Sequence, residues 1–338
     1  MLAEILTEAS KQGASDIHLR INSVRFRVNG ELIPQSQFKV DMNNIFSIVA
    51  EVLKISEDEV RAIDKEFDKD ISYSVTGVGR FRVNVAKQRG TFMMTLRIVN
   101  FDVPEWTELG VPKGLTEVLQ SNKGLLLVTG PTGSGKSTTL AALIRLINET
   151  RDFNIVTIED PIEYLHKDKK SIISQREVGV DTTFHNGLRA VLRQDPDVIL
   201  IGELRDAETM EIALTAAETG HLVLSTLHTN SAVSSISRFL SEFPAEKHEQ
   251  IRNQLSANLL GVFTQTLLKS TRGGRALAYE LLVPNDAMRK NIREAKFLQI
   301  KQAMESSAQC ISMKKSLEKL EAAKLITAQQ KAEMLTIS

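Results

Sequence analysis

A glycine-rich turn between an apolar strand and a helix constrains this chain more than any other feature. The turn follows the apolar run 125–129 and reads Gly130-Pro131-Thr132-Gly133-Ser134-Gly135-Lys136-Ser137-Thr138. It matches the P-loop pattern G-x-x-x-x-G-K-[ST] in the required strand-to-helix context. Glycines let backbone N–H groups curl around phosphates, and the helix N-terminus adds a favourable potential. These residues are therefore predicted to bind ATP, with Lys136 at the β- and γ-phosphates and Ser137 on Mg²⁺.

From Gly114 onward, short apolar runs alternate with helical stretches. Strands are expected at 125–129, 155–158, 198–201 and 222–226. Strands separated by helices predict a mostly parallel sheet with both faces covered, which is an α/β fold. Asp206 is expected to cap one helix, with Gly220 just past its end. The C-terminal region should be mostly helical. Its apolar packing stripe consists of Leu317, Leu320 and Leu325.

Residues 1–100 predict a smaller α+β domain. The run 24–28 alternates apolar and polar residues, which indicates a half-buried strand, and Asn29-Gly30 predicts the hairpin turn after it. Asp41 is expected to cap a helix with one apolar face. That face consists of Ile45, Val49 and Val52. Residues 101–113 contain two prolines and predict a linker to the second domain.

Two further alternating strands in this domain predict a hairpin with an arginine pair. Pairing Phe81 with Ile98 aligns the apolar sets and puts Arg82 opposite Arg97. Two opposed cations repel, so an anion must offset them. Carboxylates of the same chain are one candidate. A nucleotide phosphate is the other, because an inserted arginine stabilises charge in the transition state of phosphoryl transfer. Arg80 lies on the same strand face.

An acidic segment follows the strand expected at 155–158. Its carboxylates are Glu159, Asp160 and Glu163. Ligands of open α/β sheets bind beyond the carboxyl ends of the strands, so this is a suitable place for a site. One carboxylate could polarise an attacking water, and another could hold magnesium through water. A solvated acidic loop is the alternative.

A second acidic position follows the strand expected at 198–201. The sequence Gly202-Glu203 resembles the end of a Walker B strand, although many P-loop enzymes have aspartate there. Glu203 can still bind the magnesium shell, because that ion needs only hard oxygen ligands. Arg205 and Asp206 come next, and they predict a surface ion pair and a helix cap.

Two histidines, His221 and His228, flank the strand expected at 222–226. A histidine at a strand end can sense a phosphate or orient a carboxylate. A structural role is the alternative for both, and nothing around them indicates a metal.

Composition excludes several classes of function. The 42 basic and 42 acidic side chains cancel, so no global field favours nucleic acid or an anionic membrane. Cys310 is the one cysteine, which rules out an internal disulfide and a Cys-rich zinc site and suits a reducing compartment. No signal peptide is apparent, and the longest apolar runs fall far short of a bilayer span. A cytoplasmic protein is expected.

Several motifs together resemble the type IV pilus and type II secretion ATPase superfamily, closest to its PilT/PilU retraction group. The segment Ala14-Ser15-Asp16-Ile17-His18-Leu19 is similar to that group's opening motif. Further matches are Gly79-Arg80-Phe81-Arg82-Val83-Asn84, the acidic segment from Thr157 to Tyr164, Gln175-Arg176-Glu177-Val178, Gly202-Glu203-Leu204-Arg205-Asp206, and the run from Thr215 to His221 that leads to the His box at His228. The resemblance covers nearly the whole chain.

The resemblance implies a PAS-like N-terminal domain joined to a RecA-like ATPase domain with C-terminal helices, at 1–100 and 114–338. It implies Glu163 as the catalytic glutamate and Glu203 as the Walker B acid. It also implies that Arg82 and Arg97 close on the nucleotide. Arg238, which precedes Phe239 and Phe243-Pro244, matches a group arginine with an interface role.

The function implied is ATP hydrolysis in a homo-hexamer that retracts a type IV pilus for twitching motility. Its partners would be an inner-membrane platform protein and other pilus ATPases, reached from the cytoplasmic side. Extension and secretion ATPases typically carry an extra N-terminal domain and often four zinc-binding cysteines, and neither is expected here from the length and the single cysteine. However, the segment 287–294 matches the retraction motif Ala-Ile-Arg-Asn-Leu-Ile-Arg-Glu only at its ends.

That departure leaves room for other functions. An accessory or regulatory pilus ATPase with weak turnover is one alternative, and an extension or secretion ATPase is another. A nucleic-acid translocase is disfavoured, because the net charge is zero and no stretch combines aromatic and basic residues.

Overall fold

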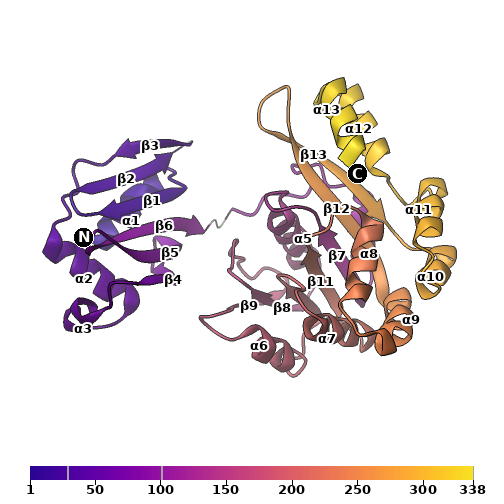
Figure 1. Cartoon of the computed structure of the whole chain (residues 1–338), viewed down its shortest axis with the longest axis horizontal. Helices are drawn as coiled ribbons and strands as arrows, with labels where there is room; N and C mark the ends of the chain where they lie inside the picture. Colours follow the sequence, from indigo (N-terminus) through magenta and orange to yellow (C-terminus); the bar gives the residue numbers. More distant parts are fainter. Residues whose placement is uncertain (29, 100–101, 338) are drawn as a thin grey trace. The chain divides into compact units, whose positions relative to one another are not determined.

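The computed structural model describes residues 1–28, 30–99 and 102–337, which form two compact units (Figure 1). The described residues of the first unit run to Val99, and the second unit begins at Asp102. The predicted turn residue Asn29 and the first position of the predicted linker, Phe101, lie outside the described residues. Each unit is a folded body with its own core.

The N-terminal unit is an antiparallel sheet with helices packed on one face. Its helices are α1 (Leu2–Lys11), α2 (Met42–Leu53) and α3 (Glu57–Ala62). Its strands are β1 (Asp16–Arg20), β2 (Ser23–Val28), β3 (Glu31–Pro34), β4 (Asp68–Val75), β5 (Gly79–Gln88) and β6 (Thr91–Val99). They pair in the order β3-β2-β1-β6-β5-β4. The alternation predicted for β2 is present at its centre, because Val24 and Phe26 are buried on either side of the exposed Arg25, while Arg27 and Val28 are half-buried.

Periodic apolar positions decide which face of this sheet is covered. One core cluster takes Phe81, Val83 and Leu96 from the sheet and buries them against apolar residues of α1 and α2. Asp41 caps α2 as predicted, since its side chain accepts a hydrogen bond from the backbone N–H of Asn44 at 2.8 Å. The opposite face of the sheet carries the polar set.

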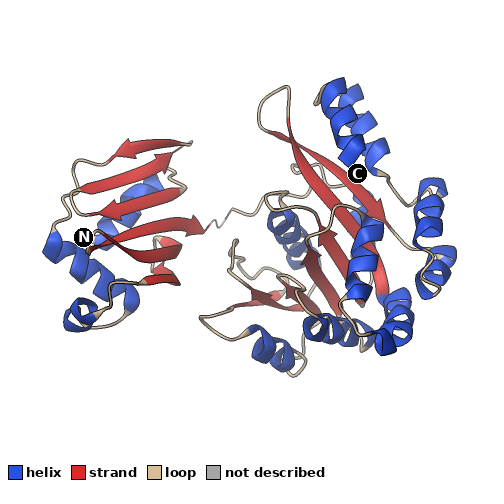
Figure 2. Ribbon diagram, viewed as in Figure 1, coloured by secondary structure: helices blue, strands red, loops and turns tan. Residues whose placement is uncertain are grey.

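The second unit is built on a sheet that is parallel except at one edge (Figure 2). Its strands are β7 (Gly124–Thr129), β8 (Asn154–Glu159), β9 (Ile172–Glu177), β10 (Val198–Ile201), β11 (Leu222–Leu227), β12 (Leu259–Lys269) and β13 (Arg275–Leu282). They lie in the order β13-β12-β7-β11-β10-β8-β9, with β13 antiparallel to β12. The strands predicted at 125–129, 155–158, 198–201 and 222–226 are therefore confirmed, while β9, β12 and β13 were not predicted.

Helices cover both faces of that sheet. They are α4 (Lys113–Val118), α5 (Lys136–Thr150), α6 (Phe184–Val191), α7 (Ala207–Glu218), α8 (Ala232–Ser241), α9 (His248–Asn258), α10 (Asp286–Arg293), α11 (Phe297–Ser306), α12 (Met313–Ala322) and α13 (Ala328–Ile337), with a short 3₁₀ turn at Ala245–Lys247. Leu125 and Leu127 of β7 belong to the core cluster that contains α7. Leu126 and Val128 belong to the cluster that contains α5. Both faces are buried, which is why β7 is continuously apolar.

The predicted signals at the ends of α7 are present. Asp206 accepts a hydrogen bond from the backbone N–H of Thr209 at 2.8 Å, and Gly220 follows the helix with φ of 117°. Such a positive φ suits glycine. In the C-terminal region, Leu317 is buried against Ala276 and Ala278 of β13. The leucine stripe is thus a packing surface, as predicted.

A half-buried carboxylate, that of Glu280, joins β13 to the starts of two helices. Glu280 Oε1 accepts a hydrogen bond from the backbone N–H of Ala232, the first residue of α8, at 2.7 Å. The same side chain also accepts one from the backbone of Met313, the first residue of α12. Burial raises the pKa of Glu280, and the two backbone donors oppose that shift. The segments described here include no helix long and apolar enough to span a membrane.

Candidate nucleotide site

The loop between β7 and α5 has the shape that a phosphate-binding turn requires. Gly130 has φ of 144°, and a Cβ placed there would lie 2.2 Å from the backbone oxygen of Gln265. Gly135 precedes α5 as its N-cap residue and is in the left-handed region with φ of 86°. Side chains are excluded at Gly130 by this close approach, so the backbone itself can face a ligand. The first N–H groups of α5 have no partner within the helix.

Gln265 of β12 holds this loop by hydrogen bonds of its side-chain amide. Gln265 is 1% exposed, and its Nε2 donates a hydrogen bond to the carbonyl oxygen of Ser134 at 2.6 Å. Its Oε1 accepts one from Thr139 Oγ1 at 2.8 Å. Both ends of the amide are therefore satisfied, and together they join the loop to the first turn of α5. No local sequence pattern marks Gln265, because it lies far along the chain from the loop.

Lys136 lies beside the glycine loop at the start of α5. Its Nζ donates hydrogen bonds to the carbonyl oxygens of Gly130 and Pro131 at 2.9 and 3.2 Å. Burial lowers the pKa of Lys136, while the carboxylates of Glu203 and Glu163 act in the opposite direction. The ammonium group is thus held over the loop by backbone oxygens and faces both acids.

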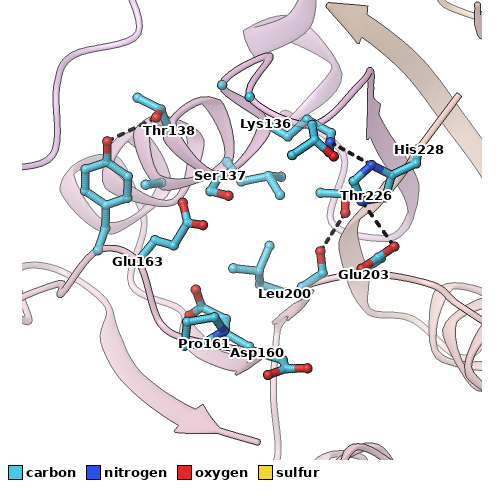
Figure 3. A pocket seen from close by; sticks show the side chains of 18 of the residues that line it. Lys136, Ser137, Thr138, Asp160, Pro161, Glu163, Leu200, Glu203, Thr226 and His228 are labelled. Atoms are coloured by element: carbon cyan, nitrogen blue, oxygen red, sulfur yellow. Dashed lines mark hydrogen bonds and ion pairs between the residues drawn. The ribbon is translucent and has the colours of Figure 1, made fainter. Parts of the chain in front are cut away.

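A cavity of about 380 Å³ lies next to this loop (Figure 3). Its walls come from α5, from the ends of β8, β10 and β11, and from the loop after β8. Most predicted site residues line it, namely Thr132, Gly133, Gly135, Lys136, Ser137, Thr138, Glu163, Glu203 and His228. It lies at the carboxyl edge of the parallel strands, where open α/β sheets bind ligands. Lining residues that no sequence pattern singled out include His166, Phe184 and Arg275.

Glu203 is fixed by two cationic or polar neighbours. Its Oε2 accepts a hydrogen bond from Arg205 Nε at 2.8 Å, and its Oε1 lies 3.2 Å from His228 Nε2. Arg205 also reaches Asp160 Oδ2 at 3.3 Å, so the predicted ion pair is present. The Nδ1 atom of His228 is 3.5 Å from Lys136 Nζ. Figure 3 shows the chain of contacts from Lys136 through His228 to Glu203.

The other histidine lies elsewhere. His221 Nδ1 is 2.9 Å from the carbonyl oxygen of Ala216, at the C-terminal end of α7. It is not among the residues that line the cavity. His221 therefore has a structural role, whereas His228 contacts two groups of the candidate site.

Glu163 reaches the cavity from the loop after β8. Its side chain is exposed and points into the space between α5 and Asp160 (Figure 3). Within the described residues its carboxylate has no hydrogen bond or ion pair. A carboxylate in that condition keeps its lone pairs available, which is what a general base for an attacking water requires.

Glu159 and His166 are half-buried ionisable groups in the wall of the same cavity. Thr157 Oγ1 and Gln175 Nε2 donate hydrogen bonds to Glu159 Oε1 at 2.6 and 3.2 Å. Burial nevertheless raises the pKa of Glu159 to about 7. Burial also lowers the pKa of His166 to about 4. Both groups therefore favour the neutral form in the folded protein.

Glu159→Gln is expected to remove a loss of stability that accompanies rising pH. The pKa of Glu159 is about 7 in the folded protein against an ordinary 4.5, so the unfolded chain releases this proton first. Stability is therefore lost as pH rises through that window, and an amide, which does not ionise, lacks the loss. The measurement is the free energy of unfolding by urea at several pH values. Identical pH dependence in the variant and the wild type would contradict the assignment. The exposed Glu246→Gln is the matched control.

The predicted arginine pair lies in the N-terminal unit. Arg82 of β5 is directly opposite Arg97 of β6, which confirms the predicted register. Arg97 Nε is 2.8 Å from Asp16 Oδ1, and Arg82 is 3.7 Å from Asp70 Oδ2. Carboxylates of the same unit thus offset the two cations. The guanidinium groups stay accessible, because the side chains of Arg97 and Arg82 are 69% and 45% exposed.

Two further arginines were named from the sequence. Arg80 lies on β5 beside Arg82, on the same face of the strand. Arg238 lies on α8 and forms an ion pair with Glu242 one turn later. Neither residue lines the cavity next to the glycine loop.

The metal prediction rests on oxygen ligands in this cavity. No group of three or more His, Cys, Asp and Glu side chains suited to a metal ion occurs in the part of the chain that is described. Magnesium usually keeps several waters and binds through one or two protein oxygens and the substrate phosphates. Ser137 and Glu203 line the same cavity and offer such oxygens.

Comparisons with known proteins show which family the chain resembles. The family described as "Type II/IV secretion system protein" matches residues 1–332. The type IV pilus retraction ATPase PilT of Pseudomonas aeruginosa is 43% identical over 308 residues, which covers 90% of this chain and 89% of that protein. A twitching motility protein of Neisseria gonorrhoeae is 40% identical over 308 residues, covering 90% and 82%.

A solved structure extends the likeness to three dimensions. The crystal structure of the pilus retraction motor PilT with bound ADP matches with a TM-score of 0.89 at 46% identity. The match covers 98% of this chain and 96% of that one. A likeness of this size over both units means that the two chains share one fold, an N-terminal domain followed by a RecA-like domain.

Proposed function

The chain belongs to the type II/IV secretion system protein family, and we propose that this ATPase drives retraction of a type IV pilus. One observation carries the proposal. The glycine loop, Lys136, Glu163 and Glu203 converge on one cavity in a chain that is 43% identical to a pilus retraction ATPase over 90% of its length. Among P-loop proteins, that combination favours a motor over a passive nucleotide-binding protein.

The residues of the cavity have different roles in hydrolysis. The loop amides, Lys136 and Ser137 hold the triphosphate, with further contacts from the rest of the segment 130–138. Glu163 accepts a proton from the attacking water, because its carboxylate faces the cavity and has no other partner in the described chain. Mg²⁺, when bound, would neutralise developing phosphate charge. Ser137 and, through water, Glu203 would hold it.

His228 and Arg205 keep Glu203 in place. His228 contacts both Glu203 and Lys136, so it can respond to a change in the charge around the phosphates. Arg205 fixes the other carboxylate oxygen of Glu203. We propose that this arrangement reports the state of the nucleotide to the strand ends of β10 and β11.

The assembly we propose is a homo-hexamer of PAS-like and RecA-like domains. The predicted domain limits of 1–100 and 114–338, with a linker at 101–113, are part of this proposal. Arg82 and Arg97 would close on the nucleotide, and Arg238 would contribute to an interface. Force would act on an inner-membrane platform protein from the cytoplasmic side, together with other pilus ATPases. No nucleic acid is involved.

An accessory pilus ATPase with weak turnover is the second candidate, favoured by the segment 287–294. In that segment Met288 and Ile292 are buried, and Arg289 donates a hydrogen bond to the carbonyl oxygen of Ser256 at 2.6 Å. The altered middle of the motif includes the exposed Lys290, which a partner would meet. Steady-state turnover of the purified chain separates the two candidates, because the retraction motor must hydrolyse ATP by itself.

Deletion of the gene is expected to give cells with excess surface pili and no twitching motility. Extension would continue while disassembly stops, so filaments accumulate. Pilus number by electron microscopy and the width of twitching zones measure both effects, and the wild-type gene supplied in trans should restore them. Bald cells would instead assign the protein to extension and overturn the retraction proposal.

A further inference from the structure

The loop that carries Glu163 must be held by something other than that side chain. The carboxylate of Glu163 has no hydrogen bond or ion pair within the described residues, and the side chain is exposed. An unrestrained carboxylate samples several rotamers, and most of them place the base away from the attacking water. The orientation of Glu163 therefore depends on how firmly its own backbone is fixed.

Side chains of the neighbouring edge strand β9 fix that backbone on both sides. Before Glu163, the backbone N–H of Ile162 donates a hydrogen bond to Glu177 Oε2 at 3.1 Å. After it, Gln175 Nε2 donates to the carbonyl oxygen of Tyr164 at 2.8 Å. Gln175 Oε1 in turn accepts from the backbone N–H of His166 at 2.9 Å.

Gln175 also connects this loop to the strand before it. Its Nε2 donates a second hydrogen bond, to Glu159 Oε1 at 3.2 Å. One amide thus joins the last residue of β8 to two backbone groups beyond Glu163. A further tie runs from Tyr164 to the P-loop helix, where its hydroxyl is 3.0 Å from Thr138 Oγ1. The loop is anchored to β8, β9 and α5.

We propose that Gln175 is a positioning residue for catalysis, which holds the loop so that Glu163 faces the attacking water. This inference rests on the proposed function, since it assumes that Glu163 is the general base. Gln175 does not line the cavity, so contact with the nucleotide does not explain the motif Gln175-Arg176-Glu177-Val178. Positioning of the Glu163 loop gives this motif a role. A misplacement of about 1 Å can cost on the order of a hundredfold in rate.

Gln175→Met tests the proposal, because methionine keeps the length and volume of glutamine but neither donates nor accepts these bonds. We expect kcat to fall about tenfold or more, with the KM for ATP and the affinity for ADP within about twofold of wild type. The matched control is Ser174→Ala, an exposed neighbour on the same strand, which should keep wild-type kinetics. Wild-type kcat in Gln175→Met would overturn the proposal.

A second experiment distinguishes positioning from a general loss of structure. In the Glu163→Gln background, Gln175→Met should lower the residual kcat no further, because a residue that acts only through Glu163 has nothing left to position. Multiplying losses would overturn the proposal. If Gln175→Met does not fold by circular dichroism, Gln175→Ala replaces it, since water can then reach the freed backbone groups. Wild-type kcat in Glu163→Gln itself would instead remove the general base from the proposed function.

Discussion

Glu163→Gln is expected to lower kcat for ATP hydrolysis by about two to four orders of magnitude, the usual contribution of a general base. The amide has the size of the carboxylate but cannot accept the proton of the attacking water. Glu163 has no hydrogen bond or ion pair in the described chain, so its replacement breaks no structural contact. Lys136 is affected electrostatically, because Glu163 is one of the two carboxylates that oppose the lowering of the Lys136 pKa by burial.

Steady-state phosphate release at saturating ATP, combined with ADP affinity by calorimetry, measures this effect. Affinity should change little, since the phosphates are held by the loop and Lys136. The exposed Glu246→Gln serves as the control for a lost carboxylate. Turnover in Glu163→Gln within about threefold of wild type would assign the base to another acid of the cavity, such as Asp160.

Lys136→Ala is expected to weaken nucleotide binding by about a hundredfold and to abolish measurable turnover. Each hydrogen bond to a charged group is worth about 1.5–3 kcal/mol, so losing the ammonium at the phosphates removes that amount or more. The ammonium also bonds the carbonyl oxygens of Gly130 and Pro131. The loop thus loses an internal support together with its ligand contact.

The Lys136→Arg variant tests whether the positive charge alone is enough for nucleotide binding, because it keeps the charge but changes the shape of the cationic group. Arginine keeps the positive charge, but its planar guanidinium cannot occupy the place of a compact ammonium over two carbonyl oxygens. We expect it to remain strongly impaired, while the exposed Lys123→Ala binds ADP as the wild type does. Calorimetric titration with ADP measures all three variants. ADP affinity in Lys136→Ala within about threefold of wild type would contradict the loop's assigned role.

Local patterns predicted the parts of the fold that depend on neighbours in sequence. The glycine loop and the strands that lead to Glu203 and His228 have periodicity or fixed spacing, so composition and order suffice. The register that puts Arg82 opposite Arg97 followed from pairing apolar sets across one hairpin. The helix caps at Asp41 and Asp206 depend on bonds to residues three positions later.

Local sequence patterns could not predict contacts between segments that are far apart in the chain. Strand β9 is an edge strand whose sequence mixes exposed Ile172 with polar Gln175 and Glu177, so no apolar run marks it. Strand β12 contains a register shift between Leu259 and Gly261, which breaks the regular alternation. Gln265 has its role only because folding brings it under the glycine loop. The chemical roles of the site residues remain predictions for the kinetic experiments.

The carboxylate of Glu280 makes the starts of α8 and α12 depend on each other. It accepts backbone hydrogen bonds from both Ala232 and Met313, and it is half-buried. If either helix withdraws, this acid loses one of its donors, which costs on the order of 1 kcal/mol. A shift at the start of α8 therefore changes the hydrogen bonding of the same carboxylate that accepts from the start of α12. Truncations or fusions near Met313 should accordingly be judged by their effect on nucleotide turnover as well as on solubility.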